Sequence, residues 1–213
     1  MYSSVSSFGK HALLIEWGHI IDEKVTFEIV SMVKYLNNLN IDGVVDIVPA
    51  YVSLTIFYVP DRLEPSNLVK HIKEFYNTTV HSNTPNEIEI PVFYEDKNSV
   101  DMKNISTLTG LSIYDVIEIH CASVYTLCFM GFLPGFLYLS GLDDRLFVPR
   151  KTTPNLHIKK GSVAIGGYQT GIYPQNSPGG WYVIGHTDFS VIDFYKPPYT
   201  TLNPGDQVRF VAL

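Results

Sequence analysis

One dense block of the sequence, residues 128–187, reads CFMGFLPGFLYLSGLDDRLFVPRKTTPNLHIKKGSVAIGGYQTGIYPQNSPGGWYVIGHT. Glycine and proline recur throughout this block beside aromatic residues. Glycine tolerates backbone angles and close approaches that a side chain forbids, whereas proline fixes its own φ. A stretch in which glycine and proline recur this often specifies loops of defined shape. Loops of this kind usually form binding surfaces, so the block predicts a binding site.

From EIEIPVFY (87–94) to the end of the chain, short apolar runs alternate with turns that contain glycine and proline. The runs expected to form strands are ASVYTLCFM (122–130), GSVAIGG (161–167), WYVIG (181–185), FSVIDFY (189–195) and DQVRFVAL (206–213). Helices are expected only near 101–107 and at 112–120, where Ser112 and Asp115 have the spacing of a capping box. This pattern predicts an all-β closed barrel or sandwich rather than a parallel α/β sheet.

The first 84 residues show strand and helix patterns in turn. Runs at 2–8 and 11–17 predict one strand pair, and GVVDIV (43–48) and YVSLTIFY (51–58) predict a second. Between the pairs, a helix is expected to begin at the cap residue Asp22 and to end in an asparagine-rich stretch. Its apolar positions fall on one face at spacings of three and four, at Val25, Ile29, Val33 and Leu36.

A second helix is expected to begin at Pro65, because proline suits a first helical turn, and to end in the turn-forming stretch 77–86. Its buried stripe is Leu68, Ile72 and Phe75. The resulting order, ββαββα, predicts a two-layer α+β domain in which two helices cover one face of an antiparallel sheet. The sequence therefore predicts two domains, 1–84 and 85–213.

Composition narrows the classes of function. The 213 residues, 46% of them hydrophobic, can form two small cores. A formal charge of −6 and the absence of any Lys/Arg cluster argue against nucleic acid as a partner. No stretch approaches the roughly 20 apolar residues that span a bilayer, and residues 1–10 lack an apolar signal region, so we expect no membrane association and a cytoplasmic location. Cys121 and Cys128 are interpreted as small buried hydrophobes.

Four segments of the block occur in one order at short spacings: GFLPGFLYLSGLDDRL (131–146), VPRKTTP (148–154), GSVAIGGYQTGIYP (161–174) and SPGGWYVIGHT (177–187). Together with VDIVPAYVSLTIFY (45–58), EIPVFY (89–94) and LSIYDVIEIHCASVY (111–125), they make the chain resemble the KipI/PxpB family. This is the family of bacterial 5-oxoprolinase B subunits, also called allophanate hydrolase subunit 1. It is similar to part of the carboxyltransferase region of urea carboxylase. The resemblance implies a cyclophilin-like β-barrel for residues 85–213, without implying prolyl isomerase activity.

The resemblance also implies a function. A protein of this family would act with a C subunit (allophanate hydrolase subunit 2, KipA type) and an A subunit (LamB/YcsF type) to convert 5-oxoproline to glutamate at the expense of ATP, with Mg²⁺. The sequence contains no P-loop, no GxGxxG and no HExxH motif, so we expect no metal site in this chain and no activity from it alone.

Two alternatives remain open. The KipI name implies an inhibitor that docks on a sporulation-type histidine kinase through its N-terminal domain. The urea carboxylase similarity implies a carboxyltransferase subunit. That function needs biotin on a separate carrier, since no AMKM or VMKM carrier motif occurs here.

Two residues are candidates for catalysis. His120 ends a predicted helix, and imidazole titrates near neutrality, which suits general acid or base catalysis. A histidine at a helix C-terminus can equally interact with the helix dipole. Arg150 can hold a carboxylate or phosphate bidentately, with a surface salt bridge as the alternative.

The remaining candidates form a predicted substrate or subunit pocket. They share aromatic faces, glycine-rich backbone or small polar groups, and they are Tyr125, Gly131, Phe132, Pro134, Gly135, Phe136, Tyr138, Gln169, Tyr173, Ser177, Pro178, Gly179, Gly180 and Trp181. A barrel-closing loop and a tight turn packed on Trp181 are the structural alternatives. Asp143 and Asp144 are interpreted as solvated turn carboxylates rather than Mg²⁺ ligands.

The chain departs from the family at one position. The family pattern has a second Pro-Arg pair shortly after the first, but this chain has Pro154 followed by Asn155. Lys151 and His157 lie close in sequence and are the nearest candidates to compensate for the missing charge. The departure puts full catalytic competence in question.

Overall fold

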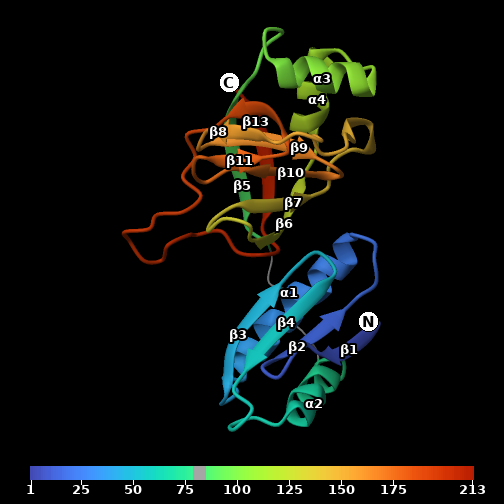
Figure 1. The fold of residues 1–213 in the computed structure, drawn as a ribbon, viewed down its shortest axis with the longest axis vertical. Coiled ribbons are helices and arrows are strands. Elements are labelled where there is room, and N and C mark those ends of the chain that lie inside the picture. Colours follow the sequence, from blue (N-terminus) through green and yellow to red (C-terminus); the bar gives the residue numbers. More distant parts are fainter. Residues whose placement is uncertain (79–84) are drawn as a thin grey trace. The chain divides into compact units, whose positions relative to one another are not determined.

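The structure, a computed structural model, describes residues 1–78 and 85–213. It divides into two compact units, Met1–Thr84 and Pro85–Leu213 (Figure 1), and the apolar side chains of each unit form a separate core. Residues 79–84 of the predicted turn stretch 77–86 lie outside the described residues. Within the described part of the chain, every helix is too short or too polar to cross a membrane.

The first unit has the predicted order ββαββα. Its elements are β1 (Ser4–Ser7), β2 (Ala12–Glu16), α1 (Glu23–Asn38), β3 (Val44–Pro49), β4 (Ser53–Tyr58) and α2 (Pro65–Phe75). The four strands form one antiparallel sheet in the order β1-β2-β4-β3. The predicted α+β fold of this unit is confirmed.

Capping and burial in this unit follow the sequence pattern. The Asp22 side chain accepts a hydrogen bond from the Lys24 backbone N–H at 2.6 Å, and Pro65 lies in the first turn of α2. Ile29 of α1 and Ile72 of α2 share one core with Ile15 of β2 and with apolar residues of β4. Because alternate residues of a strand point to one face, both helices cover the same face of the sheet.

The second unit is built around a closed barrel of seven strands in the order β10-β7-β6-β13-β5-β12-β9. Its strands are β5 (Glu87–Tyr94), β6 (Tyr125–Met130), β7 (Leu137–Ser140), β9 (Ser162–Gly166), β10 (Gln169–Ile172), β12 (Tyr182–His186) and β13 (Gln207–Ala212). Strand β13 pairs with β5 in parallel, and the other neighbours pair antiparallel. The predicted barrel is therefore confirmed.

Further elements pack around this barrel. Helix α3 (Val100–Thr109) contacts β12, and α4 (Ile113–Ala122) contacts β13. The predicted capping box is present at α4, where the side chains of Ser112 and Asp115 each accept a hydrogen bond from the other's backbone N–H. A short 3₁₀ helix η1 (Asp144–Leu146) follows β7, and β8 (Asn155–Ile158) pairs with β11 (Ser177–Gly179) as a separate two-stranded sheet.

One predicted strand is wrong. The run FSVIDFY (189–195) forms no strand, and within it Tyr195 is almost fully exposed. The Tyr195 backbone N–H instead donates to the Asp193 side chain, and the Asp193 N–H donates to the carbonyl of Tyr199. The two prolines between Tyr195 and Tyr199 have no N–H to contribute to a ladder, so β-branched and aromatic composition alone does not make a strand here.

Candidate functional site

In the barrel strands that carry the predicted pocket residues, the two faces belong to two different apolar clusters. On β9, Val163 and Ile165 belong to the core that fills the barrel, whereas Ala164 between them belongs to a second apolar cluster. Strand side chains alternate between faces, so this second cluster lies on the outside of the barrel wall. We call it the outer-face cluster and define it as Phe136, Tyr138, Ile158, Ala164, Tyr173 and Trp181.

Two glycines make the floor of the outer-face cluster. A Cβ atom on Gly166 of β9 would lie 2.5 Å from Cδ1 of Trp181, which is too short for a real Cβ contact. One on Gly171 of β10 would lie 3.1 Å from Cζ3 of the same ring, which is tighter than most such contacts. The indole therefore lies directly against the barrel wall because these two positions carry no side chain.

The aromatic rings of this cluster pack edge to face around Phe136. Its ring centroid lies 4.9 Å from that of Tyr173 at 85° and 5.4 Å from that of Trp181 at 79°. Tyr138 completes the group, with its centroid 4.7 Å from Phe136. Such geometry is the favoured one for aromatic pairs, so it fixes the ring positions. The result is a rigid and almost fully buried apolar cluster, in which only Tyr138 is partly exposed.

Arg150 brings a positive charge to this cluster. Its guanidinium carbon lies 5.8 Å from the ring centroid of Trp181. Among the described residues it forms no ion pair with a carboxylate. Burial raises the pKa of Tyr138 and raises that of Tyr173 to about 12, while the Arg150 charge acts in the opposite direction on both. Both phenols are thus protonated at neutral pH and lie within electrostatic reach of the guanidinium.

Two oxygen atoms in this region have no partner. Gln169 Oε1 and Ser177 Oγ are buried and form no hydrogen bond within the described residues. Gln169 is the cross-strand neighbour of Gly166, over which Trp181 lies, so its side chain starts beside the indole. An unsatisfied buried polar atom costs about 1–3 kcal/mol, and such atoms indicate a site that a ligand or water completes.

The turn that joins β6 to β7 is strained. Phe132 has φ of +66° although it is not glycine, and its ring is 62% exposed. The ring stands edge-on to Phe136 with centroids 5.6 Å apart, and the Gly131 N–H closes the turn by donating to the Phe136 carbonyl. Pro134 is exposed, whereas Gly135 packs against Ile192. Backbone strain of this kind is concentrated at functional sites.

His120 and Tyr125 lie elsewhere, inside the barrel. His120 is fully buried and stacks on Phe210, with ring centroids 4.6 Å apart. The Tyr125 hydroxyl donates to the His120 carbonyl at 2.9 Å, and burial raises the pKa of Tyr125. The structure thus separates these two predicted site residues from all the others, because they occupy interior positions rather than the outer face.

Hydrogen bonds use both ring nitrogens of His120. The Thr170 hydroxyl donates to the Ala164 carbonyl, so it accepts from His120 Nε2–H at 2.9 Å. Nδ1 must then accept from the Tyr94 hydroxyl at 2.7 Å. Burial lowers the pKa of His120 to about 3. The imidazole is therefore neutral and has no nitrogen left for a substrate, so we assign it a role in the barrel core, in place of the predicted general acid or base.

The residues near the missing arginine do not replace it. The Lys151 ammonium is bound to Asp101 at 2.7 Å, so its charge is already used. The side chain of Asn155 accepts a hydrogen bond from the His157 backbone N–H, and both residues are exposed on β8. Arg150 is the cation that contacts the outer-face cluster. Sequence reasoning missed Asp101, because nothing in its spacing distinguishes it from a solvated acid of a first helical turn.

Asp143, one of the two acidic residues at the 3₁₀ helix, is paired with an arginine side chain. Asp143 binds the Arg145 side chain through both of its carboxylate oxygens, at 2.9 and 2.8 Å, and these hydrogen bonds lower the pKa of Asp143 to about 2. Across residues 1–78 and 85–213, no group of three or more His, Cys, Asp or Glu side chains is placed to hold a metal ion.

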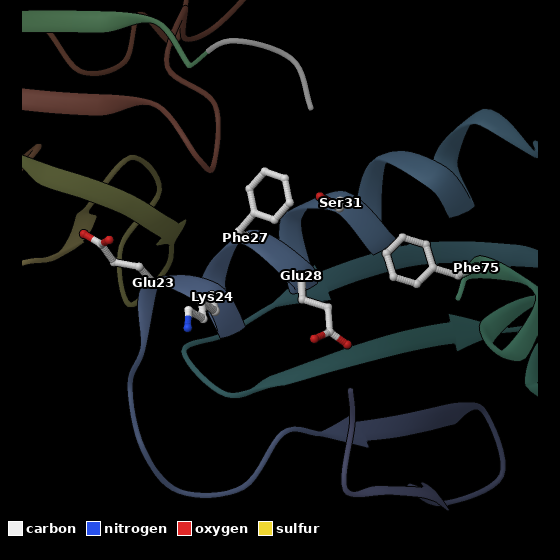
Figure 2. A pocket seen from close by; sticks show the side chains of 6 residues that line it. All are labelled: Glu23, Lys24, Phe27, Glu28, Ser31 and Phe75. Carbon is white, nitrogen blue, oxygen red and sulfur yellow. The ribbon is translucent and has the colours of Figure 1, made fainter. Parts of the chain in front are cut away.

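Two cavities lie among the described residues, and only Tyr173 of the predicted site residues lines either of them. One in the first unit has a volume of about 430 Å³ and is lined by α1 side chains together with Phe75 (Figure 2). Figure 2 shows Phe27 projecting from α1, and this ring is half exposed. The other cavity, about 260 Å³, lies beside Tyr173 in the second unit, with Lys160 and His186 in its lining.

The comparisons with known proteins agree with this architecture. Residues 3–202 match the family described as carboxyltransferase domain, subdomain C and D. The 5-oxoprolinase B subunit of Bacillus subtilis (strain 168) is 33% identical over 221 residues, which cover 98% of this chain and 92% of that protein. The protein of the same name from Escherichia coli O157:H7 is 46% identical over 124 residues, covering 58% and 57% of the two chains.

Solved structures show the same fold. The crystal structure of TTHA0988 matches with a TM-score of 0.84 at 32% identity, covering 95% of this chain but only 39% of that chain. The protein PH0987 from Pyrococcus horikoshii matches with a TM-score of 0.57 at 34% identity, over 99% and 97%. The family match over residues 3–202 and the relative from Bacillus subtilis at 33% identity show that this chain belongs to the carboxyltransferase-domain family that includes the 5-oxoprolinase B subunits.

Proposed function

We propose that this chain is the B subunit of an ATP-dependent 5-oxoprolinase, which converts 5-oxo-L-proline to L-glutamate together with separate A and C subunits. The names of its relatives support this proposal. The observation that carries it is the outer-face cluster, where the unpaired Arg150 guanidinium stands over Trp181 beside two protonated phenols.

The cluster matches the chemistry of 5-oxoproline in three respects. Arg150 can bind its carboxylate through two parallel hydrogen bonds. The exposed ring of Phe132 and the partly exposed ring of Tyr138, which both pack against Phe136, can cover the methylene groups of the 5-oxoproline ring. The buried Gln169 Oε1, which lacks a donor, can accept the lactam N–H. In this proposal the chain binds and orients the substrate and keeps water from its apolar side.

The described residues of this chain do not supply the set of acidic ligands that Mg²⁺ requires. Mg²⁺ requires several oxygen ligands, usually carboxylates with phosphates. The described residues contain no group of three or more His, Cys, Asp or Glu side chains placed to hold a metal ion, and Asp143 is already bound to Arg145. In this proposal ATP and Mg²⁺ therefore bind to the partner subunits, and the chain alone is inactive.

The test is glutamate release from 5-oxoproline by this chain alone and with its candidate A and C subunits, with ATP-only mixtures as the control. We expect activity solely in the full mixture. Arg150→Ala should assemble normally and abolish that activity, because the carboxylate then lacks its cation. Normal turnover by the Arg150→Ala complex would refute our assignment of the outer-face cluster as the substrate site.

A further inference from the structure

The residue that follows Arg150 is fixed by an ion pair that is largely but not fully buried. The Lys151 ammonium lies 2.7 Å from Oδ1 and 2.8 Å from Oδ2 of Asp101, the second residue of α3. Their side chains are only 16% and 14% exposed. The carboxylate also lies in the first turn of a helix, where the helix dipole favours negative charge. Asp101 is therefore a stable anchor for the segment that carries Arg150.

The same anchor reaches the strand that follows Trp181. Asp101 Oδ2 accepts a hydrogen bond from the Val183 backbone N–H at 2.8 Å, two residues beyond Trp181. The Lys151 backbone N–H donates to the carbonyl of Gly180 at 2.8 Å, one residue before Trp181. The two segments are thus tied together on both sides of the indole.

The Arg150 side chain has few contacts that fix its position. Its side chain is exposed, and among the described residues its one contact with an aromatic ring is the indole of Trp181. We propose that Asp101 is a positioning residue for Arg150: by binding Lys151 and Val183 it places the guanidinium over Trp181, where the substrate carboxylate binds. The proposal deepens the proposed function and rests on it for the identity of the substrate.

Loss of the Asp101 carboxylate should displace both Lys151 and Arg150. Removing one partner of a buried ion pair leaves the other charge buried and uncompensated, so the Lys151 side chain must move toward solvent. The backbone of Arg150 moves with its neighbour. Displacing a binding group by about 1 Å can reduce an enzyme's efficiency about 100-fold, whereas the chemical groups themselves stay unchanged. The loss should therefore affect substrate binding more than turnover.

Asp101→Asn is the variant of choice, because the amide keeps an oxygen for the Val183 N–H while it removes the charge and replaces one acceptor of the Lys151 ammonium with an NH2 donor. In the reconstituted complex we expect the KM for 5-oxoproline to rise about tenfold while kcat changes less than about twofold. Asp101→Glu, which keeps the charge, should recover part of the loss. Glu118→Gln, an exposed acid on α4, is the matched control and should leave both constants unchanged.

Lys151→Met tests whether the pair acts as one unit. If it does, the double variant with Asp101→Asn raises KM no further than either single variant. An additive effect of the two substitutions would contradict a shared role.

A second measurement is independent of activity. The chain has two tryptophans, so its nitrogen-labelled spectrum contains two indole N–H signals, which Trp17→Phe assigns. Asp101→Asn and Arg150→Ala should both shift the Trp181 signal and leave the Trp17 signal in place. An unshifted Trp181 signal and an unchanged KM in Asp101→Asn would overturn the proposal. If instead the signal shifts but Arg150→Ala leaves KM unchanged, Asp101 does position Arg150 and the proposed substrate site is wrong.

Discussion

Folding stability should depend on pH through His120. This residue is fully buried, both of its nitrogens are hydrogen-bonded, and burial lowers its pKa from 6.5 to about 3. In the unfolded chain the imidazole takes up a proton below pH 6.5, but in the folded chain it does not until about pH 3. The unfolded state therefore binds more protons in this window, so the free energy of unfolding decreases as the pH falls.

The magnitude follows from the two pKa values. Each pH unit between them changes the free energy of unfolding by about 1.4 kcal/mol. Between about pH 8 and pH 5 the loss amounts to about 2 kcal/mol, because protonation of the unfolded state becomes substantial only below about pH 6.5. Carboxylates contribute little above about pH 5, since their ordinary pKa values lie near 4. Between about pH 8 and pH 5, the pH dependence of the free energy of unfolding therefore comes mainly from histidines.

Urea unfolding at a series of pH values measures this effect. In a Trp17→Phe background, the fluorescence of Trp181 reports the second unit alone. At about pH 8, His120→Gln should have a lower free energy of unfolding than the parent, because a buried ring is removed. Its free energy of unfolding should, however, fall less than that of the parent as the pH decreases, because the His120 contribution is absent. His157→Gln replaces an exposed histidine of β8 and is the matched control. Parallel curves for the parent and His120→Gln across the same pH range would refute a neutral, buried His120.

Three further predictions concern residues around the outer-face cluster. Gly166→Ala should destabilise the second unit by about 1–3 kcal/mol, since its Cβ would meet Trp181 at 2.5 Å, whereas Gly180→Ala, with 3.6 Å to its nearest neighbour, should be nearly neutral in the same urea titration. Phe132→Gly should be about 1 kcal/mol more stable than Phe132→Ala, because only glycine accepts φ of +66° without strain, and equal stabilities would contradict this. Gln169→Met should raise the KM for 5-oxoproline in the reconstituted complex about tenfold, since it removes the acceptor for the lactam N–H, and an unchanged KM would exclude that contact.

Local features of the fold were predictable because they depend on neighbours in the chain. The Asp22 cap, the Ser112 and Asp115 capping box and the proline start of α2 all involve residues that lie close together in sequence. The strand predicted at 189–195 failed because β propensity measures how well a side chain packs in a sheet, and no described strand pairs with this run.

The candidate site was predictable only in part. The glycine, proline and aromatic pattern pointed to four of the six residues of the outer-face cluster, and these four do come together, whereas Ile158 and Ala164 were not among the predicted residues. His120 and Tyr125 carry groups suited to proton transfer, but they occupy the barrel interior, where such a group has no access to substrate. Residue type indicates what a side chain can do, whereas the face of the strand or helix that carries it decides whether it can reach a ligand.

By itself, the sequence determined the element order of the first unit, the barrel class of the second and the family, because periodicity, caps and motif order are local properties of the chain. Only the tertiary structure decided which face of the barrel carries the outer-face cluster, that Asp101 pairs with Lys151, and that Arg150 lies over Trp181 without an ion-pair partner among the described residues. Asp101 and Lys151 are 50 residues apart, and Asp101 and Val183 are 82 apart. Closure of the barrel brings such residues together, and no local pattern records their contact.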